Sequence, residues 1–380
     1  MDFGLTEEQT MLRDMLQRYL RDSYDFETRR KRILQGGPDT ALWQDFAQTL
    51  GILAAPLPER AGGLGGGAIE TMIVMEALGE ALVPEPFLET VVIAGGLLAR
   101  LPGEASDALL GRIAGGEAKV ALAHGEPQSR YALHDVRTTA KAKGNGWVLD
   151  GTKQVVVGGP DAVQLIVSAR TSGDTRDRDG IALFLLGSDA KGIEHHDYRL
   201  IDERGASDLM LRDVHVPGDA LLTGEGAALP LIEQVIDEAT AAVCAEAVGA
   251  MRRMVDDTVE YAKQRRQFGQ PLAGFQVLQH RMVDMYMALE QAISAAYLAT
   301  LQLDAAPGER ARAVSAAKAV IGDAARFVGQ NAVQLHGAMG MTEELAVGHY
   351  FKRVSVIEQQ FGPADHHLAR YAALRRAEAA

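Results

Sequence analysis

The chain has 380 residues, of which 47% are hydrophobic, and a formal net charge of −13 at pH 7. This length allows two or three domains, or one large composite unit. The acidic balance argues against nucleic acid as a partner, because phosphate binding is driven by clustered Lys and Arg. A single cysteine, Cys244, excludes an intramolecular disulfide and any multi-cysteine metal site, so we expect a reducing, cytoplasmic compartment.

The first part of the chain predicts helices without a signal peptide or membrane anchor. MDFGLTEEQ lacks a basic or apolar leader, and no apolar run reaches the roughly 18 residues needed to cross a bilayer. Apolar residues from Met11 to Leu20 recur at helical spacing, and Thr6 before two glutamates predicts a helix start. Further helices are expected over residues 42–53 and 69–82. The basic cluster 29–32 is expected to be a solvated helix face.

From about residue 119 the pattern changes from helical to alternating. Strands are expected at residues 163–167, 181–185 and 209–217. The dipeptides Asn145-Gly146 and Asp150-Gly151 predict two-residue hairpin turns, because both tolerate positive φ. This block therefore predicts an antiparallel sandwich or barrel.

The last part of the chain predicts long helices again, over residues 231–264, 273–303, 309–335 and 345–378. The order of helices, strands and helices favours an α+β arrangement over βαβ units. His366 and His367 could be taken for a metal-binding pair, but adjacent residues on a helix point in different directions. No metal site is expected.

Three glycine-punctuated segments could carry chemistry. The loop 58–67 offers backbone amides to a phosphate, but no strand precedes it, and a structural turn is the expectation. Segment 261–276, YAKQRRQFGQPLAGFQ, places Arg265 and Arg266 at a helix C-terminus. Arginine suits bidentate phosphate recognition, but it can equally complement the helix dipole. Segment 334–342, QLHGAMGMT, alone predicts an interhelix turn.

Taken in order along nearly the whole chain, these segments resemble the acyl-CoA dehydrogenase family. The resemblance is carried by the opening helix and by PERAGGLG (58–65), AHGEP (123–127), LDGTK (149–153), LRDVHVP (211–217) and the two segments 261–276 and 334–342. Several ordered matches of this kind are far more specific than any one of them.

The resemblance implies a fold and a reaction. The family's fold has an N-terminal helical domain, a central antiparallel β-barrel and a C-terminal four-helix bundle, expected here at residues 1–118, 119–222 and 223–380. Its members assemble as dimers of dimers, bind FAD and remove two hydrogens from an acyl-CoA thioester. A glutamate takes the α-proton while the β-hydrogen leaves as hydride to the flavin. An electron-transfer flavoprotein or a similar acceptor is the implied electron partner.

In the family, each flavin is held by two chains, and the helical half comes from a neighbour. The resemblance assigns this half to seven residues in the two C-terminal segments: Arg265, Gln267, Phe268, Gln276, Gln334, Gly337 and Gly340.

The barrel half departs from the family pattern. The family has Trp-Ile-Thr or Trp-Ile-Ser shortly after the turn lysine, whereas Lys153 is followed by Gln154 and three valines. Val157 therefore takes the place of the hydroxyl residue near flavin N5. The family's Gly-Ser-Asp run is also missing, and residues 128–131 read Gln-Ser-Arg-Tyr.

The catalytic glutamate is missing as well. Gly362 takes its usual place near the C-terminus, and Ala239 takes the alternative place used by some members. The family often has an Asp-x-x-Arg pair beside that second place; Asp237 keeps the acid, but Thr240 replaces the arginine.

One half of the flavin site thus matches the family, and the other half has changed together with the base. This pattern resembles the base-less small subunits of two-component acyl-CoA dehydrogenases, which predicts a homologous partner that carries the glutamate. Two alternatives stay open. The chain could form a self-sufficient homotetramer with its base moved to Glu358 or Glu238, or it could bind acyl-CoA or flavin without turnover. The acyl group stays open too.

Overall fold

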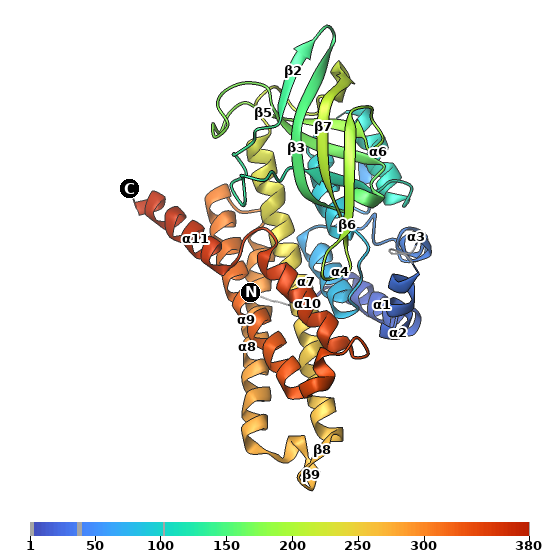
Figure 1. Ribbon diagram of the computed structural model, residues 1–380, viewed down its shortest axis with the longest axis vertical. Helices are drawn as coiled ribbons and strands as arrows, with labels where there is room; N and C mark the ends of the chain where they lie inside the picture. Colours follow the sequence, from blue (N-terminus) through green and yellow to red (C-terminus); the bar gives the residue numbers. More distant parts are fainter. Residues whose placement is uncertain (1–3, 36–39, 102, 380) are drawn as a thin grey trace. The chain divides into compact units, whose positions relative to one another are not determined.

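Helices, then strands, then helices follow one another along the chain, as predicted. The structure is a computed structural model that describes residues 4–35, 40–101 and 103–379 (Figure 1). The helices before the strands are α1 (Glu7–Ser23), α2 (Phe26–Leu34), α3 (Thr40–Gln48), α4 (Ala68–Glu80), the π-helix η2 (Leu88–Ala94), α5 (Gly95–Ala99) and α6 (Glu104–Ala114). The helices after them are α7 (Leu229–Gln264), α8 (Gln276–Leu301), α9 (Pro307–His336), α10 (Ala346–Gln359) and α11 (Ala364–Ala379). No helix within the described ranges is long and apolar enough to cross a membrane.

The chain divides into two compact units. The bundle unit contains residues 1–35, 68–83 and 240–380, and the sheet unit contains residues 36–67 and 84–239. In the bundle unit, α9 packs against α8, α10 and α11. In the sheet unit, inward-facing side chains such as Leu149, Val167 and Phe184 form the core of the sheet. The three-domain division at residues 118 and 222 stays a prediction.

The strands form one open, curved sheet. They are β1 (Val120–Ala123), β2 (Thr139–Lys143), β3 (Gly146–Val157), β4 (Gln164–Arg170), β5 (Ile181–Gly187), β6 (Ile193–Arg199) and β7 (Gly205–Pro217). Their order is β1-β4-β2-β3-β7-β6, and β5 pairs with β4. β1 and β2 run parallel to β4, whereas the other pairs are antiparallel.

The expected closed antiparallel barrel is therefore wrong, and the sheet is a half-barrel. β6 reads IEHHDYR, contains no buried residue and lies at one edge of the strand order, so the sheet stays open on this side. At the other edge, Ala227 and Leu221 form isolated bridges to Ile181 and Phe184 of β5. Both edges are thus protected by polarity or by a covering segment, without closure.

The first of the two predicted turns forms a hairpin at a shifted position, and the second does not form. β2 and β3 form a hairpin in which Lys143 pairs with Gly146, so the loop is Gly144-Asn145, one residue earlier than expected. The Asp150-Gly151 turn is wrong, because both residues lie inside β3 at an irregularity opposite β7. A Cβ on Gly151 would lie 2.4 Å from Thr138 Oγ1. The glycine here provides space for a close neighbour, not a turn.

Two helix predictions also need correction. The segment 345–378 is broken between α10 and α11, where Phe361 and Gly362 both have positive φ, +60° and +116°. The cluster 29–32 is not uniformly solvated. Arg29 is 3% exposed and donates from Nε to the carbonyl oxygen of Leu82 at 2.7 Å, because it faces the rest of the bundle unit.

Candidate functional site

The first predicted flavin segment is a short hairpin between the C-terminus of α7 and the N-terminus of α8 (Figure 1). β8 (Arg266–Gln267) pairs with β9 (Gln270–Pro271), and Arg266 donates to the carbonyl oxygen of Gly269 across the turn. Phe268 at its tip has φ +50° and is 92% exposed. The Arg265 side chain is exposed and makes no hydrogen bond or ion pair with any residue that the structure describes. The hairpin thus presents an aromatic ring and a cation outward, and Gln267 and Gln276 are also exposed.

The second predicted flavin segment is the end of α9 and the 3-10 turn η6 (Gly337–Met341). Gln334 and Gly337 are exposed, whereas Gly340 is buried. Gly337 has φ +62°, so its conformation favours glycine. At Gly340 the reason is space, since a Cβ there would lie 2.8 Å from the carbonyl oxygen of Val333.

The structure brings these two segments together at a pair of rings that sequence reasoning missed. Tyr261, one turn before Arg265, stacks on His336, with ring centroids 4.3 Å apart and planes inclined by 26°. All seven residues assigned by resemblance to the flavin's helical half belong to the bundle unit. Their role toward FAD stays a prediction.

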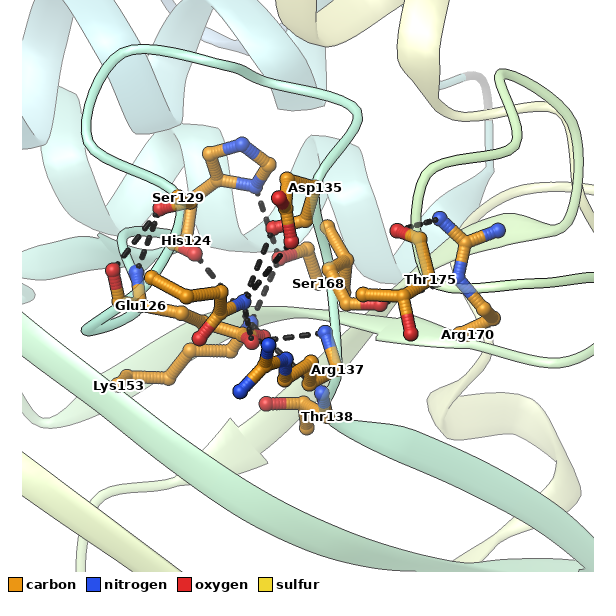
Figure 2. Close-up of polar contacts among 12 residues, drawn as sticks. His124, Glu126, Ser129, Asp135, Arg137, Thr138, Lys153, Ser168, Arg170 and Thr175 are labelled. Atoms are coloured by element: carbon orange, nitrogen blue, oxygen red, sulfur yellow. Dashed lines mark hydrogen bonds and ion pairs between the residues drawn. The ribbon is translucent and has the colours of Figure 1, made fainter.

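The sheet unit contains a buried polar network next to the AHGEP and LDGTK segments (Figure 2). Lys153 Nζ lies 2.7 Å from Glu126 Oε1, and it also donates to Ser168 Oγ at 3.0 Å and to the carbonyl oxygen of His124 at 3.3 Å. The side chains of Lys153 and Glu126 are 0% and 2% exposed. Glu126 further accepts hydrogen bonds from the Gln128 amide and from the backbone N–H groups of Arg137 and Thr138.

The charges in this network are fixed by burial and by the partners present. Burial raises the pKa of the Glu126 carboxyl, but the Lys153 ammonium and the hydrogen bonds outweigh it and lower the pKa to about 2. Burial lowers the pKa of Lys153 to about 8, against the opposing effect of Glu126. Burial also lowers the pKa of His124 to about 3, so its imidazole is neutral and pairs with Ser168 Oγ at 2.8 Å. This enclosed network joins β3 to the segment that contains His124 and Glu126.

Two residues after Lys153, β3 has a strained and exposed residue. Val155 has φ +52°, which is rare for a β-branched residue, and it is 53% exposed. Its N–H donates to Asp208 Oδ1 at 2.9 Å, and Tyr198 donates to the same oxygen at 2.9 Å. Val155 and Val157 occupy the places where the resemblance expects tryptophan and a hydroxyl residue. Neither can stack on a flavin as an aromatic ring does, or donate a hydrogen bond.

Gly362, at the usual place of the base, lies in a closed turn of the bundle unit. It is buried, with φ +116°, and a Cβ there would lie 2.5 Å from His366 Cδ2. Lys318 Nζ donates to the carbonyl oxygens of Glu358 and Gly362, both at 2.9 Å. His367 Nε2 lies 3.1 Å from the carbonyl oxygen of Phe361. Sequence reasoning missed Lys318, and it considered His366 only as half of a metal-binding pair, not as a neighbour of Gly362.

The other candidate base positions are no better suited. Ala239 is fully buried. Glu238 Oε1 pairs with Arg100 at 2.6 Å and accepts from the Gln234 amide at 3.2 Å. Glu358 Oε1 lies 3.4 Å from Arg326 Nη2. A carboxylate held by arginine must give up part of that pairing to accept a proton.

Comparison with known proteins agrees with the order of elements. Family models described as the N-terminal, middle and C-terminal domains of acyl-CoA dehydrogenase match residues 6–117, 121–214 and 228–373. The probable acyl-CoA dehydrogenase FadE25 of Mycobacterium tuberculosis is 27% identical over 81% of this chain and 80% of its own length.

Two solved structures are similar over nearly the whole chain. The ChsE4–ChsE5 complex from Mycobacterium tuberculosis matches with a TM-score of 0.88 and 26% identity, covering 98% of each chain. The FAD complex of PigA matches with a TM-score of 0.89 and 25% identity, covering 99% of this chain and 100% of the other. With all three domain models matched in order, the chain belongs to the acyl-CoA dehydrogenase family.

Proposed function

We propose that this chain is a subunit of an FAD-dependent acyl-CoA dehydrogenase and that it completes the flavin site of a homologous partner. The partner carries the catalytic glutamate and the barrel half of that site. The flavin supplies the hydride acceptor for α,β-dehydrogenation, and the electrons leave to an electron-transfer flavoprotein or a similar acceptor. The contribution of this chain is the hairpin with Arg265 and Phe268 and the turn that follows Gln334.

The closed turn at Gly362 is the observation that carries the proposal. Proton abstraction from Cα needs a base within hydrogen-bond reach of that proton, directly or through one water. A glycine has no ionisable side chain, and the His366 ring lies where a Cβ at this position would project. The position is therefore closed to a carboxylate, and more than a single substitution separates it from a functional base.

The two halves of the flavin site differ in how well they fit the cofactor. Arg265 is exposed and its side chain pairs with none of the residues that the structure describes, which leaves the guanidinium available to a diphosphate bound by another chain. In the sheet unit, Val155 and Val157 offer neither an aromatic ring nor a hydroxyl. The helical half fits FAD, and the sheet half does not. The similarity to a solved complex of two proteins, ChsE4–ChsE5, adds support for a heteromer.

The test compares the purified chain, the purified candidate partner and the co-expressed pair with a panel of acyl-CoAs and an electron-accepting dye. We expect the lone chain to be inert and the pair to bind about one flavin per two unlike chains. The proposal is wrong if the lone chain binds one flavin per subunit and turns over at roughly 1 s⁻¹ or more, within the usual range of enzymes. In that case Glu358→Gln and Glu238→Gln would locate the moved base.

A further inference from the structure

The rings of Tyr261 and His336 stack beneath the two exposed segments that carry the predicted flavin contacts. We propose that Tyr261 and His336 are positioning residues, which fix the Arg265 hairpin and the Gly337 turn relative to each other. This inference rests on the proposed function, because it acts through the flavin that the two segments hold. Neither ring needs to touch the cofactor.

Tyr261 is tied directly to the hairpin. It lies in the last turn of α7, where its carbonyl oxygen accepts a hydrogen bond from the N–H of Arg265 at 2.8 Å. The carbonyl oxygen of Arg265 in turn accepts from the N–H of Leu272 at 2.8 Å, which closes the base of the hairpin. A shift of Tyr261 therefore moves the backbone that carries Arg265.

His336 is tied in the same way to the second segment. The residue is 6% exposed, and its Nδ1 lies 2.8 Å from the carbonyl oxygen of Ala332 in the preceding turn of α9. The η6 turn folds back over it, since a Cβ on Gly340 would lie 3.1 Å from His336 Cβ. The backbone of His336 also accepts a hydrogen bond from the Tyr261 hydroxyl at 3.3 Å. The ring thus fills the space beneath the turn that begins at Gly337.

The contact between the two rings joins these two local structures. Each segment has hydrogen bonds of its own, and the stack and the Tyr261 hydroxyl connect the two segments. A stacked aromatic pair is worth roughly a 3- to 10-fold change in an equilibrium constant beyond its area burial. We expect loss of the stack to weaken FAD binding by about that factor in the assembled complex, while Arg265 itself is unchanged.

The experiment measures FAD affinity of the full chain co-produced with its partner, for Tyr261→Leu, Tyr261→Phe, His336→Leu and the double variant. Tyr261→Phe keeps the stack but loses the hydroxyl's hydrogen bond to His336, so its FAD affinity should lie between those of the wild type and Tyr261→Leu. Tyr261→Leu and His336→Leu should each weaken FAD binding. The double variant should bind FAD as well as the more affected of the two single variants, because both changes remove the same contact. Tyr297→Leu on α8 is the matched control. If one leucine variant does not fold, the other still tests the idea.

Two further readouts separate positioning from general loss of stability. Tyr261→Leu should shift the ring-proton resonances of His336, because the ring current of Tyr261 is lost, and should speed amide hydrogen exchange at residues 337–341. An unchanged FAD affinity in Tyr261→Leu, or additive effects in the double variant, would overturn the inference. Arg265→Ala is included as a reference. If it leaves FAD affinity unchanged, the proposed function fails; if it alone weakens binding, only the positioning role fails.

Discussion

The ammonium group of Lys318 lies 2.9 Å from the carbonyl oxygen of Gly362, in the turn between α10 and α11. It donates equally to the carbonyl oxygen of Glu358, near the C-terminus of α10. A buried cation at the end of a helix satisfies carbonyl groups that no longer have helical partners. The turn at Gly362 is therefore stabilised by the Lys318 ammonium group.

Removal of this charge should loosen the turn. Lys318→Met keeps most of the apolar stem and leaves two buried carbonyl groups without their donor. Hydrogen bonds to a charged group contribute about 1.5–3 kcal/mol each, so we expect a loss of about 3 kcal/mol in the free energy of unfolding. Denaturant unfolding of the full chain measures it. A loss below about 1 kcal/mol would show that water replaces the ammonium group.

The closed position at Gly362 leads to a second prediction. Gly362→Ala must place a Cβ against His366 and adopt a positive φ, which should cost about 2–4 kcal/mol of stability. Gly337→Ala is the matched control, since it has a positive φ but no atom within 4 Å of its Cβ, and it should cost about 1 kcal/mol. When Gly362→Ala is combined with His366→Ala, the stability cost should fall close to that of Gly337→Ala, because the ring that meets the new Cβ is gone. Equal costs at the two glycines would contradict the steric argument.

The sequence predicted some elements well because their causes are local. Thr6 caps α1 as expected, with its hydroxyl accepting from the N–H of Gln9, and the helix–strand–helix order follows from apolar periodicity. The relation of Lys318 to Gly362 spans 44 positions and depends on how α9, α10 and α11 pack. Periodicity says that Lys318 is on a helix, but not that its ammonium group is enclosed.

Other features could not be predicted because alternative structures share the same pattern. Asp150-Gly151 satisfies the requirements of a hairpin turn, but the pairing of β3 with β7 continues past it. Closure of the sheet depends on strand tilt and on the edges, which alternation alone does not specify. The stack of Tyr261 on His336 joins two segments that could be identified separately by resemblance, without any sign that they meet.

The buried pair of Glu126 and Lys153 gives a prediction about acid stability. The pKa of Glu126 is lowered from 4.5 to about 2 in the folded chain. The folded state then binds fewer protons than the unfolded state between these values, so this contribution is full above pH 4.5 and is lost as pH falls toward 2. Glu126→Gln should flatten the pH dependence of unfolding in that window. An unchanged slope would contradict it.

The same pair can be separated into its parts by a double-mutant cycle. At pH 7, Glu126→Gln or Lys153→Met alone leaves one buried charge without its partner, which should cost about 3–5 kcal/mol. The double variant removes both charges and should recover much of that loss. Denaturant midpoints for the four proteins measure the coupling. Additive losses would show that the pair does not act as a unit.

The last prediction concerns Arg265 and the flavin of the assembled complex. A guanidinium can donate two parallel hydrogen bonds to phosphate oxygens, whereas lysine offers a single point charge. Because the Arg265 side chain is exposed at the base of the hairpin and pairs with no residue that the structure describes, its replacement should not destabilise the chain itself. We expect Arg265→Ala to weaken FAD binding to the complex by roughly 10- to 100-fold, and Arg265→Lys to recover only part of that loss. Equilibrium dialysis of FAD against the co-purified pair measures it, with Arg375→Ala on the exposed face of α11 as the control. If Arg265→Lys binds FAD as tightly as the wild type, the contact is a general charge effect and not bidentate recognition of a diphosphate. If Arg265→Ala also binds as tightly, this chain does not complete the flavin site.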